Sequence, residues 1–239
     1  MTLLVEDRGA VRILTMNRPE KRNALNSALT RALLECLRAA DAADPVAVVV
    51  LTGAGQGFCA GADLSEFKDL TPDRQHLVEE RAELTMQLHL AFSKMAKPVV
   101  TAINGAAMGG GAGLAIAGDL AVMAQGAKLG YPETRHGIVA AIVMANLVRQ
   151  VGRKTAFELV SLGEPLNSSQ ALALGMVNRV APDEDLLSEA LKLAEKLSNV
   201  KPEALRATKQ LFHEVADLPL EEALKRGRDT NQRMRAFKK

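Results

Sequence analysis

The sequence has little with which to stack bases: its 239 residues include no tryptophan, one tyrosine and six phenylalanines. Aromatic platforms carry most of the binding of single-stranded nucleic acid, so that function is disfavoured. The chain also has no large excess of charge of one sign, since it contains 30 Lys and Arg and 28 Asp and Glu, for a net charge of +2. Without a basic field, nucleic acid is not the expected partner.

Cysteine is scarce too, and Cys36 and Cys59 form no CxxC pair. This usage indicates free thiols in a reducing compartment. Residues 1–10 contain two acids and no apolar run, so no secretory signal peptide is predicted there. We therefore expect a cytoplasmic protein.

One uncharged stretch, residues 98–118, has the length of a membrane span. Thr101, Asn104 and six glycines within it weaken both helix propensity and hydrophobicity. A buried strand, a tight glycine turn and a buried helix explain the stretch better. We therefore expect no contact with a membrane.

What the chain does contain is an alternation of strand and helix patterns, with 48% apolar and 24% charged residues. The run at 46–52, VAVVVLT, is typical of a strand buried on both faces of a parallel sheet. This alternation predicts an α/β fold. The other expected strands are 3–5, 11–17, 99–103 and 120–123, and the expected helices between them include 26–40 and 70–95.

From residue 183 onward only helical periodicity remains. Three helices are expected, near 184–198, 203–216 and 220–235, with breaks at Lys201-Pro202 and Leu218-Pro219. The predicted division is an α/β core at 1–182 and a helical oligomerisation region at 183–239.

Two glycine-rich turns follow successive strands: TGAGQGFCAGADL at 52–64 and NGAAMGGGAG at 104–113. The first fits neither a dinucleotide fingerprint nor a phosphate loop, because the third glycine and a GK[ST] triplet are missing. Together the turns could aim two backbone N–H groups at one oxygen, which is an oxyanion hole. Tight packing of helix on strand would require the same glycines, so both interpretations stay open.

Several motifs in order carry a family resemblance. They are NRPEKRNAL at 17–25, GFCAGADLSEF at 57–67, KPVVTAINGAAMGGGAGLAIAGDLAVMA at 97–124, YPETRHGIV at 131–139 and ALALGMVNRVAP at 171–182. From about residue 3 to residue 235 the chain resembles the crotonase superfamily, the enoyl-CoA hydratase/isomerase family. The resemblance implies a spiral of ββα units with a C-terminal helical trimerisation region. It also implies a trimer or a dimer of trimers that acts on acyl-CoA thioesters through an enolate.

The resemblance also implies site residues. The N–H groups of Ala62 and Gly110 would bind the enolate oxygen. No metal or redox cofactor is expected, because preorganised backbone donors can stabilise the enolate, and coenzyme A is part of the substrate. Coenzyme A would run along the remaining implied residues, which are Lys21, Arg22, Ala24, Ala60, Asp63 and Leu64. A solvated surface explains Lys21 and Arg22 as well, and Asp63 could instead cap the following helix.

One departure from the hydratase pattern shapes the expected reaction. Hydratases of this family hold a water molecule between two glutamates, whose positions match Gly113 and Glu133. Since glycine cannot exchange a proton, we favour isomerisation of a 3-enoyl-CoA to a 2-enoyl-CoA with Glu133 as the single acid/base. His136 could replace the missing carboxylate if it faced the pocket, and no role is assigned to His89.

Two other functions stay open. One is 2-enoyl-CoA hydration, and the other is acyl-CoA binding without catalysis. Some family members bind RNA, but a solvated helix face explains the basic residues at 225–239 equally well. Hydratases often continue with a further C-terminal helix that reaches coenzyme A. Phe237 and Lys238 could substitute for it here, but the roles of that helix are not carried over to them.

Overall fold

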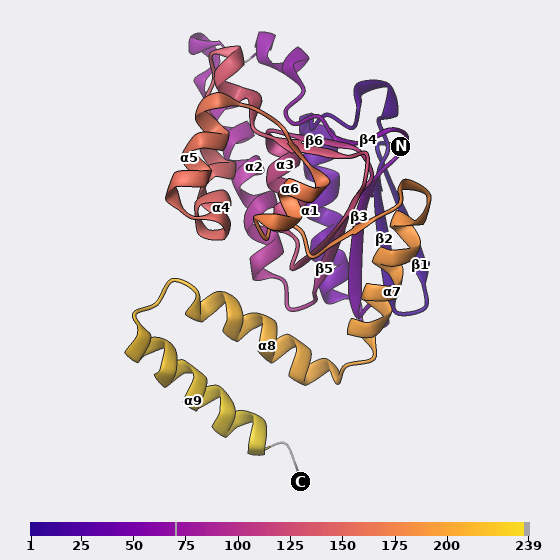
Figure 1. Cartoon of the computed structure of the whole chain (residues 1–239), viewed down its shortest axis with the longest axis vertical. Helices are drawn as coiled ribbons and strands as arrows, with labels where there is room; N and C mark the ends of the chain where they lie inside the picture. The colour runs from indigo at the N-terminus through magenta and orange to yellow at the C-terminus, as the bar shows by residue number, and fades with distance from the viewer. Residues whose placement is uncertain (70, 237–239) are drawn as a thin grey trace.

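The structure of the chain is a computed structural model that describes residues 1–69 and 71–236 (Figure 1). Its main sheet has the order β1-β2-β3-β5-β7-β10. The hairpin of β1 and β2 is antiparallel, and every later neighbour pairs in parallel, as the sequence predicts. These strands are β1 (Leu3–Arg8), β2 (Val11–Met16), β3 (Val48–Gly53), β5 (Val99–Ile103), β7 (Leu120–Ala124) and β10 (Arg179–Ala181).

A second, smaller sheet has the order β4-β6-β8-β9 and consists of very short strands. Three successive chain segments each place one strand in the main sheet and the next in the small one: β3 with β4, β5 with β6, and β7 with β8. A helix follows each pair, which is the repeat of the expected ββα spiral. The short strands are β4 (Gly57–Cys59), β6 (Ala106–Met108), β8 (Lys128–Gly130) and β9 (Leu166–Asn167).

The central strands are buried along their whole length. Every residue of β3 and β5 is buried, because α7, α3 and the short strand β4 pack against these strands, whereas β1 at the edge of the sheet is mostly exposed. The helices in the first 182 residues are α1 (Ser27–Ala42), α2 (Gln75–Lys94), α3 (Gly110–Ala117), α4 (Ala141–Val151), α5 (Arg153–Leu162) and α6 (Ser168–Ala173). Residues 98–118 therefore form β5, β6 and α3, and no helix in the described residues is long and apolar enough to cross a membrane.

The second predicted helix starts later than expected. The expected start, Leu70, lies outside the described residues, and α2 begins only at Gln75. Two short 3₁₀ helices, η2 (Leu64–Asp69) and η3 (Pro72–Arg74), occupy the stretch before it. Pro72 suits the first turn of such a helix but would interrupt the interior of a longer one.

The C-terminal helices begin and end close to the predicted bounds, at α7 (Leu186–Ser198), α8 (Pro202–Val215) and α9 (Leu220–Ala236). The first of them, α7, packs against β3, β5 and β7 of the main sheet. Of the other two, α8 packs against α2, and α9 packs against α8 and lies farther from the core (Figure 1). The domain division after residue 182 stays a prediction, and Phe237 and Lys238 lie outside the described residues.

Three side chains fasten α8 to the core. The buried Lys209 Nζ lies 2.8 Å from Asp119 Oδ2 and donates to the carbonyl of Lys97 at 2.9 Å. His213 Nε2 lies 3.2 Å from Asp119 Oδ1. Because these contacts sit near the middle and end of α8, its position relative to β5 and β7 is defined although most of the helix is exposed.

Candidate active site

The two glycine-rich turns lie against each other. A Cβ added to Gly61 would lie 3.3 Å from the amide nitrogen of Gly110, and a Cβ added to Gly110 would lie 3.8 Å from that of Ala62. Gly110 is the first residue of α3, so its N–H has no acceptor within the helix. The bridge between Leu25 and Ala62 uses the amides of Leu25 and Asp63, which leaves the N–H of Ala62 outside this pairing. The structure thus brings together the two amides that the sequence singled out.

Glycine is required at positions 61 and 111 because backbone carbonyl oxygens of the neighbouring turn or strand lie very close to them. Gly61 has φ +90°, and a Cβ on it would lie 2.7 Å from the carbonyl oxygen of Met108. A Cβ on Gly111 would lie 2.1 Å from the carbonyl oxygen of Cys59. Both alternatives from the sequence are therefore compatible: the glycines pack the turns tightly, and that packing sets the spacing of the two amides.

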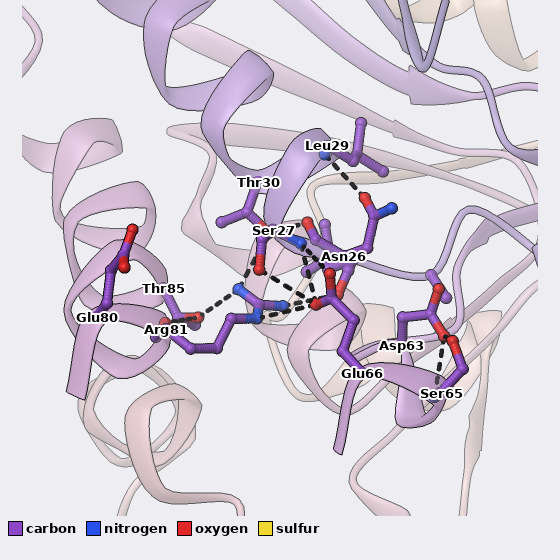
Figure 2. A network of polar contacts seen from close by, with 12 residues as sticks. Asn26, Ser27, Leu29, Thr30, Asp63, Ser65, Glu66, Glu80, Arg81 and Thr85 are labelled. Atoms are coloured by element: carbon purple, nitrogen blue, oxygen red, sulfur yellow. Dashed lines mark hydrogen bonds and ion pairs between the residues drawn. The ribbon is translucent and has the colours of Figure 1, made fainter. Parts of the chain in front are cut away.

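A charged network holds the segment that carries Ala62 (Figure 2). Arg81 on α2 donates from Nη2 to the carbonyl of Leu25, the bridge partner of Ala62, at 2.6 Å. Its Nε lies 3.4 Å from Glu66 Oε2, and both carboxylate oxygens of Glu66 accept from the Ser27 amide, at 2.9 and 3.0 Å. Burial lowers the pKa of Arg81. Arg81 therefore joins α2, the start of α1 and the turn after Ala62.

Asp63 is part of the same framework. Its Oδ1 accepts from the amide and hydroxyl of Ser65 at 3.1 and 2.6 Å, and its Oδ2 lies 2.8 Å from Nη2 of Arg18. The carboxylate thus caps the turn that starts η2, which is the structural role expected for it. These hydrogen bonds lower the pKa of Asp63 to about 2, and the hydrogen bond from the Ser65 hydroxyl has the largest effect.

The depressed pKa of Asp63 predicts a loss of stability in acid. Because the folded value lies below that of an unfolded aspartate, the stabilisation is complete above about pH 4 and is lost as the pH falls toward 2. We expect Asp63→Asn to lower the free energy of unfolding by about 1–2 kcal/mol at pH 7 and by much less at pH 2.5. Urea unfolding at both pH values measures the difference, and an equal loss at both would contradict it.

The carboxyl group expected to transfer protons lies beside the second turn. Glu133 lies in η4 (Pro132–His136), and its Oε1 is 2.7 Å from the position that a Cβ on Gly109 would take. Its Oε2 is buried and has no hydrogen-bond partner among the described residues. Burial raises the pKa of Glu133. Glu133 is half-buried, one of its oxygens has no partner among the described residues, and it lies beside Gly109, the residue before Gly110. A carboxyl in this place can take up and release a proton near an enolate.

Position 113 has no room for a second carboxylate. A Cβ on Gly113 would lie 2.3 Å from Val143 Cγ1 and 2.7 Å from His89 Cε1. His136, the histidine considered as a replacement, is exposed at the end of η4. His89 shares the buried stripe of α2 with Leu88 and Phe92, where the sequence pattern indicates core packing.

The residues expected to bind coenzyme A form two adjacent segments. The Ala60 amide donates to the carbonyl of Arg22 at 2.9 Å, which places residues 21–24 beside residues 60–64. Lys21 and Arg22 are exposed, as are Ala60 and Leu64, whereas Ala24 is buried. Exposure agrees both with phosphate binding and with a solvated surface, so the coenzyme A assignment stays a prediction.

Comparison with known proteins gives consistent matches along the chain. A family model described as enoyl-CoA hydratase/isomerase matches residues 6–238. The 2,3-dehydroadipyl-CoA hydratase of Escherichia coli K12 is 38% identical over 225 residues, covering 93% of this chain and 86% of that protein. The crystal structure of an enoyl-CoA hydratase from Bacillus anthracis has a TM-score of 0.94 at 29% identity and covers 100% of this chain and 92% of that one. Enoyl-CoA hydratase subunit I of Geobacillus kaustophilus gives a TM-score of 0.92 at 32% identity, covering 99% and 90%.

Proposed function

Because the chain belongs to the enoyl-CoA hydratase/isomerase family, we propose that it converts a 3-enoyl-CoA to a 2-enoyl-CoA. The observation that carries the proposal is the Glu133 carboxyl, which lies beside the residue before Gly110 and whose buried Oε2 has no hydrogen-bond partner among the described residues. Glu133 lies against Gly109, whereas Val143 and His89 fill the space at position 113. Moving a double bond requires one group that removes and returns a proton, and Glu133 can do both.

In the proposed reaction the thioester oxygen lies between the N–H groups of Ala62 and Gly110. The Glu133 carboxylate removes a proton from C2, and the electron pair moves onto the thioester oxygen as an enolate. Preorganised backbone donors lower the barrier to this step by several kcal/mol. Glu133 then returns the proton at C4, and the double bond moves into conjugation with the thioester. The isomerisation neither adds electrons to the substrate nor removes them overall, so the proposal includes no redox cofactor, and the two amides rather than a metal stabilise the enolate oxygen.

The proposal extends to substrate binding and assembly. We place coenzyme A along residues 21–24 and 60–64, where Lys21 and Arg22 offer positive charge to its phosphates. We also propose a cytoplasmic homo-oligomer, a trimer or a dimer of trimers, formed through the C-terminal helices. Phe212, Leu220 and Leu224 support this assembly, because α8 and α9 leave them 65, 75 and 65% exposed.

A paired assay tests the reaction. Purified protein is incubated separately with a 3-enoyl-CoA and a 2-enoyl-CoA of the same chain length, and the absorbance of the conjugated thioester is followed. We expect conjugation to appear from the 3-enoyl substrate with no change in mass. Absence of turnover on both substrates across several chain lengths would favour an acyl-CoA-binding protein without catalysis.

Hydration of a 2-enoyl-CoA is the second candidate. It is favoured by the names of the relatives, since the Escherichia coli and Bacillus anthracis proteins are both called hydratases. In the same assay hydration would appear as loss of conjugation with the added mass of one water molecule.

A further inference from the structure

Three buried polar side chains around the proposed site have atoms without a hydrogen-bond partner among the described residues. They are both ring nitrogens of His89, the hydroxyl of Tyr131 and Oε2 of Glu133. Leaving a buried polar atom unpaired costs about 1–3 kcal/mol, so native structures rarely retain such groups without another use. His89 has the largest deficit, because neither of its two nitrogens is satisfied.

The position of His89 connects it to the proposed reaction. Its Cε1 is 2.7 Å from the point where a side chain on Gly113 would begin. Cε1 is bonded to both ring nitrogens, so both lie one bond from the atom that faces position 113. Gly113 donates its amide to the carbonyl of Gly109 at 2.9 Å, so the residues beside His89 and beside Glu133 are one helical turn apart.

The buried position of His89 favours a neutral imidazole ring. Only 6% of His89 is exposed, and burial lowers its pKa to about 4. At neutral pH the ring therefore offers one N–H donor and one nitrogen acceptor, which can bind a water molecule or a hydroxyl oxygen. Val143, the other neighbour of Gly113, offers only methyl groups.

We propose that His89 is the second polar group of the site, where it holds a water molecule against Glu133, and that this gives the enzyme a 2-enoyl-CoA hydratase activity in addition to isomerisation. The proposal rests on the enolate site described above. It assigns the water-binding role to a side chain on α2 rather than to position 113 of α3.

The hydration step balances with one proton carrier. The neutral ring of His89 accepts a hydrogen bond from the water and directs its oxygen toward C3. The oxygen–C3 bond forms while the Glu133 carboxylate takes one water proton, and the π electrons of the double bond move onto the thioester oxygen. The enolate then collapses as Glu133 gives that proton to C2. Both side chains end in their initial protonation states, and His89 never becomes charged.

The test uses His89→Leu, which replaces the ring with the residue type found at Leu84 and Leu88 on the same buried stripe. We expect kcat for hydration to fall about 100-fold because the water is no longer oriented, while kcat for isomerisation changes less than about threefold. His76→Leu, at an exposed position of α2, is the matched control and should leave both rates unchanged. Thermal unfolding of each variant shows whether the fold is kept.

The outcomes separate this inference from the proposed function. Isomerisation without hydration in the unmodified enzyme, or hydration that survives in His89→Leu, would overturn the role of His89 and leave the isomerase intact. Equal loss of both activities would show that His89 only supports the packing of α2 on α3. Hydration without isomerisation would overturn the proposed isomerase, and the His89→Leu rate would still decide the role of His89.

Discussion

Replacing Glu133 by glutamine is expected to remove nearly all turnover of a 3-enoyl-CoA. The amide keeps the size of the carboxyl but cannot take up the C2 proton, and loss of a general acid–base group costs about 10²–10⁴-fold in kcat. Since Glu133 is not placed in a binding role, KM should change little. Stopped assays at saturating substrate measure the loss, with Glu158→Gln on the exposed face of α5 as the matched control.

The pH dependence of the same step follows from the burial of Glu133. The base must be ionised to act, and burial raises its pKa above the usual 4.5. The rate of isomerisation should therefore rise with pH, and the midpoint of the rise should lie above that of an ordinary glutamate. A rate in Glu133→Gln within tenfold of the unmodified enzyme would contradict the assignment of this residue as the base.

The second large effect is expected at Gly111, through geometry rather than through loss of a reacting group. A Cβ there would lie 2.1 Å from the carbonyl oxygen of Cys59 and 2.7 Å from its Cβ. Neither atom is the far end of a flexible side chain, so in Gly111→Ala the first turn of α3 must move away from β4. That movement separates the amides of Gly110 and Ala62. Losing one donor of an oxyanion hole costs about 10²–10³-fold in kcat.

The same substitution should also destabilise the protein, because overpacking a buried site costs about 1–3 kcal/mol. Gly227→Ala on α9 is the matched control, since a Cβ there meets nothing within 4 Å. It should be neutral in activity and should stabilise the helix by up to about 1 kcal/mol. Urea unfolding and kcat for both variants complete the comparison. Full activity in Gly111→Ala would show that the spacing of the two amides does not control the reaction.

The parts of the fold that the sequence predicts are those with long, consistent patterns. The unbroken apolar run that became β3 and the proline that starts α8 are local signals, and both elements formed where expected. The small sheet had no such signal. Its strands, such as Gly57–Cys59 and Ala106–Met108, are three residues long and rich in small residues, and only pairing between distant segments makes them strands.

The residues of the site also differ in whether the sequence predicts them. Ala62, Gly110 and Glu133 belong to motifs that are continuous in sequence, so the resemblance is enough to single them out. The structure places Ala62 beside Gly110 and Glu133 beside Gly109. His89 is 24 residues before Gly113 in the chain and reaches it only through the packing of α2 on α3. A buried histidine on an apolar stripe has the same sequence pattern whether it packs or reacts.

The contacts of Arg81 have a consequence for partial unfolding of the protein. The residue joins α2 to the Leu25 carbonyl and to Glu66, so the helix and the segment that carries Ala62 share one set of contacts. Partial unfolding that detaches the first turns of α2 must also release the strand-like segment around Ala62. Amide hydrogens on these two segments, far apart in sequence, should then exchange with solvent as a single cooperative unit. Thermal unfolding of the first turns of α2 would thus disrupt the site before the main sheet begins to unfold.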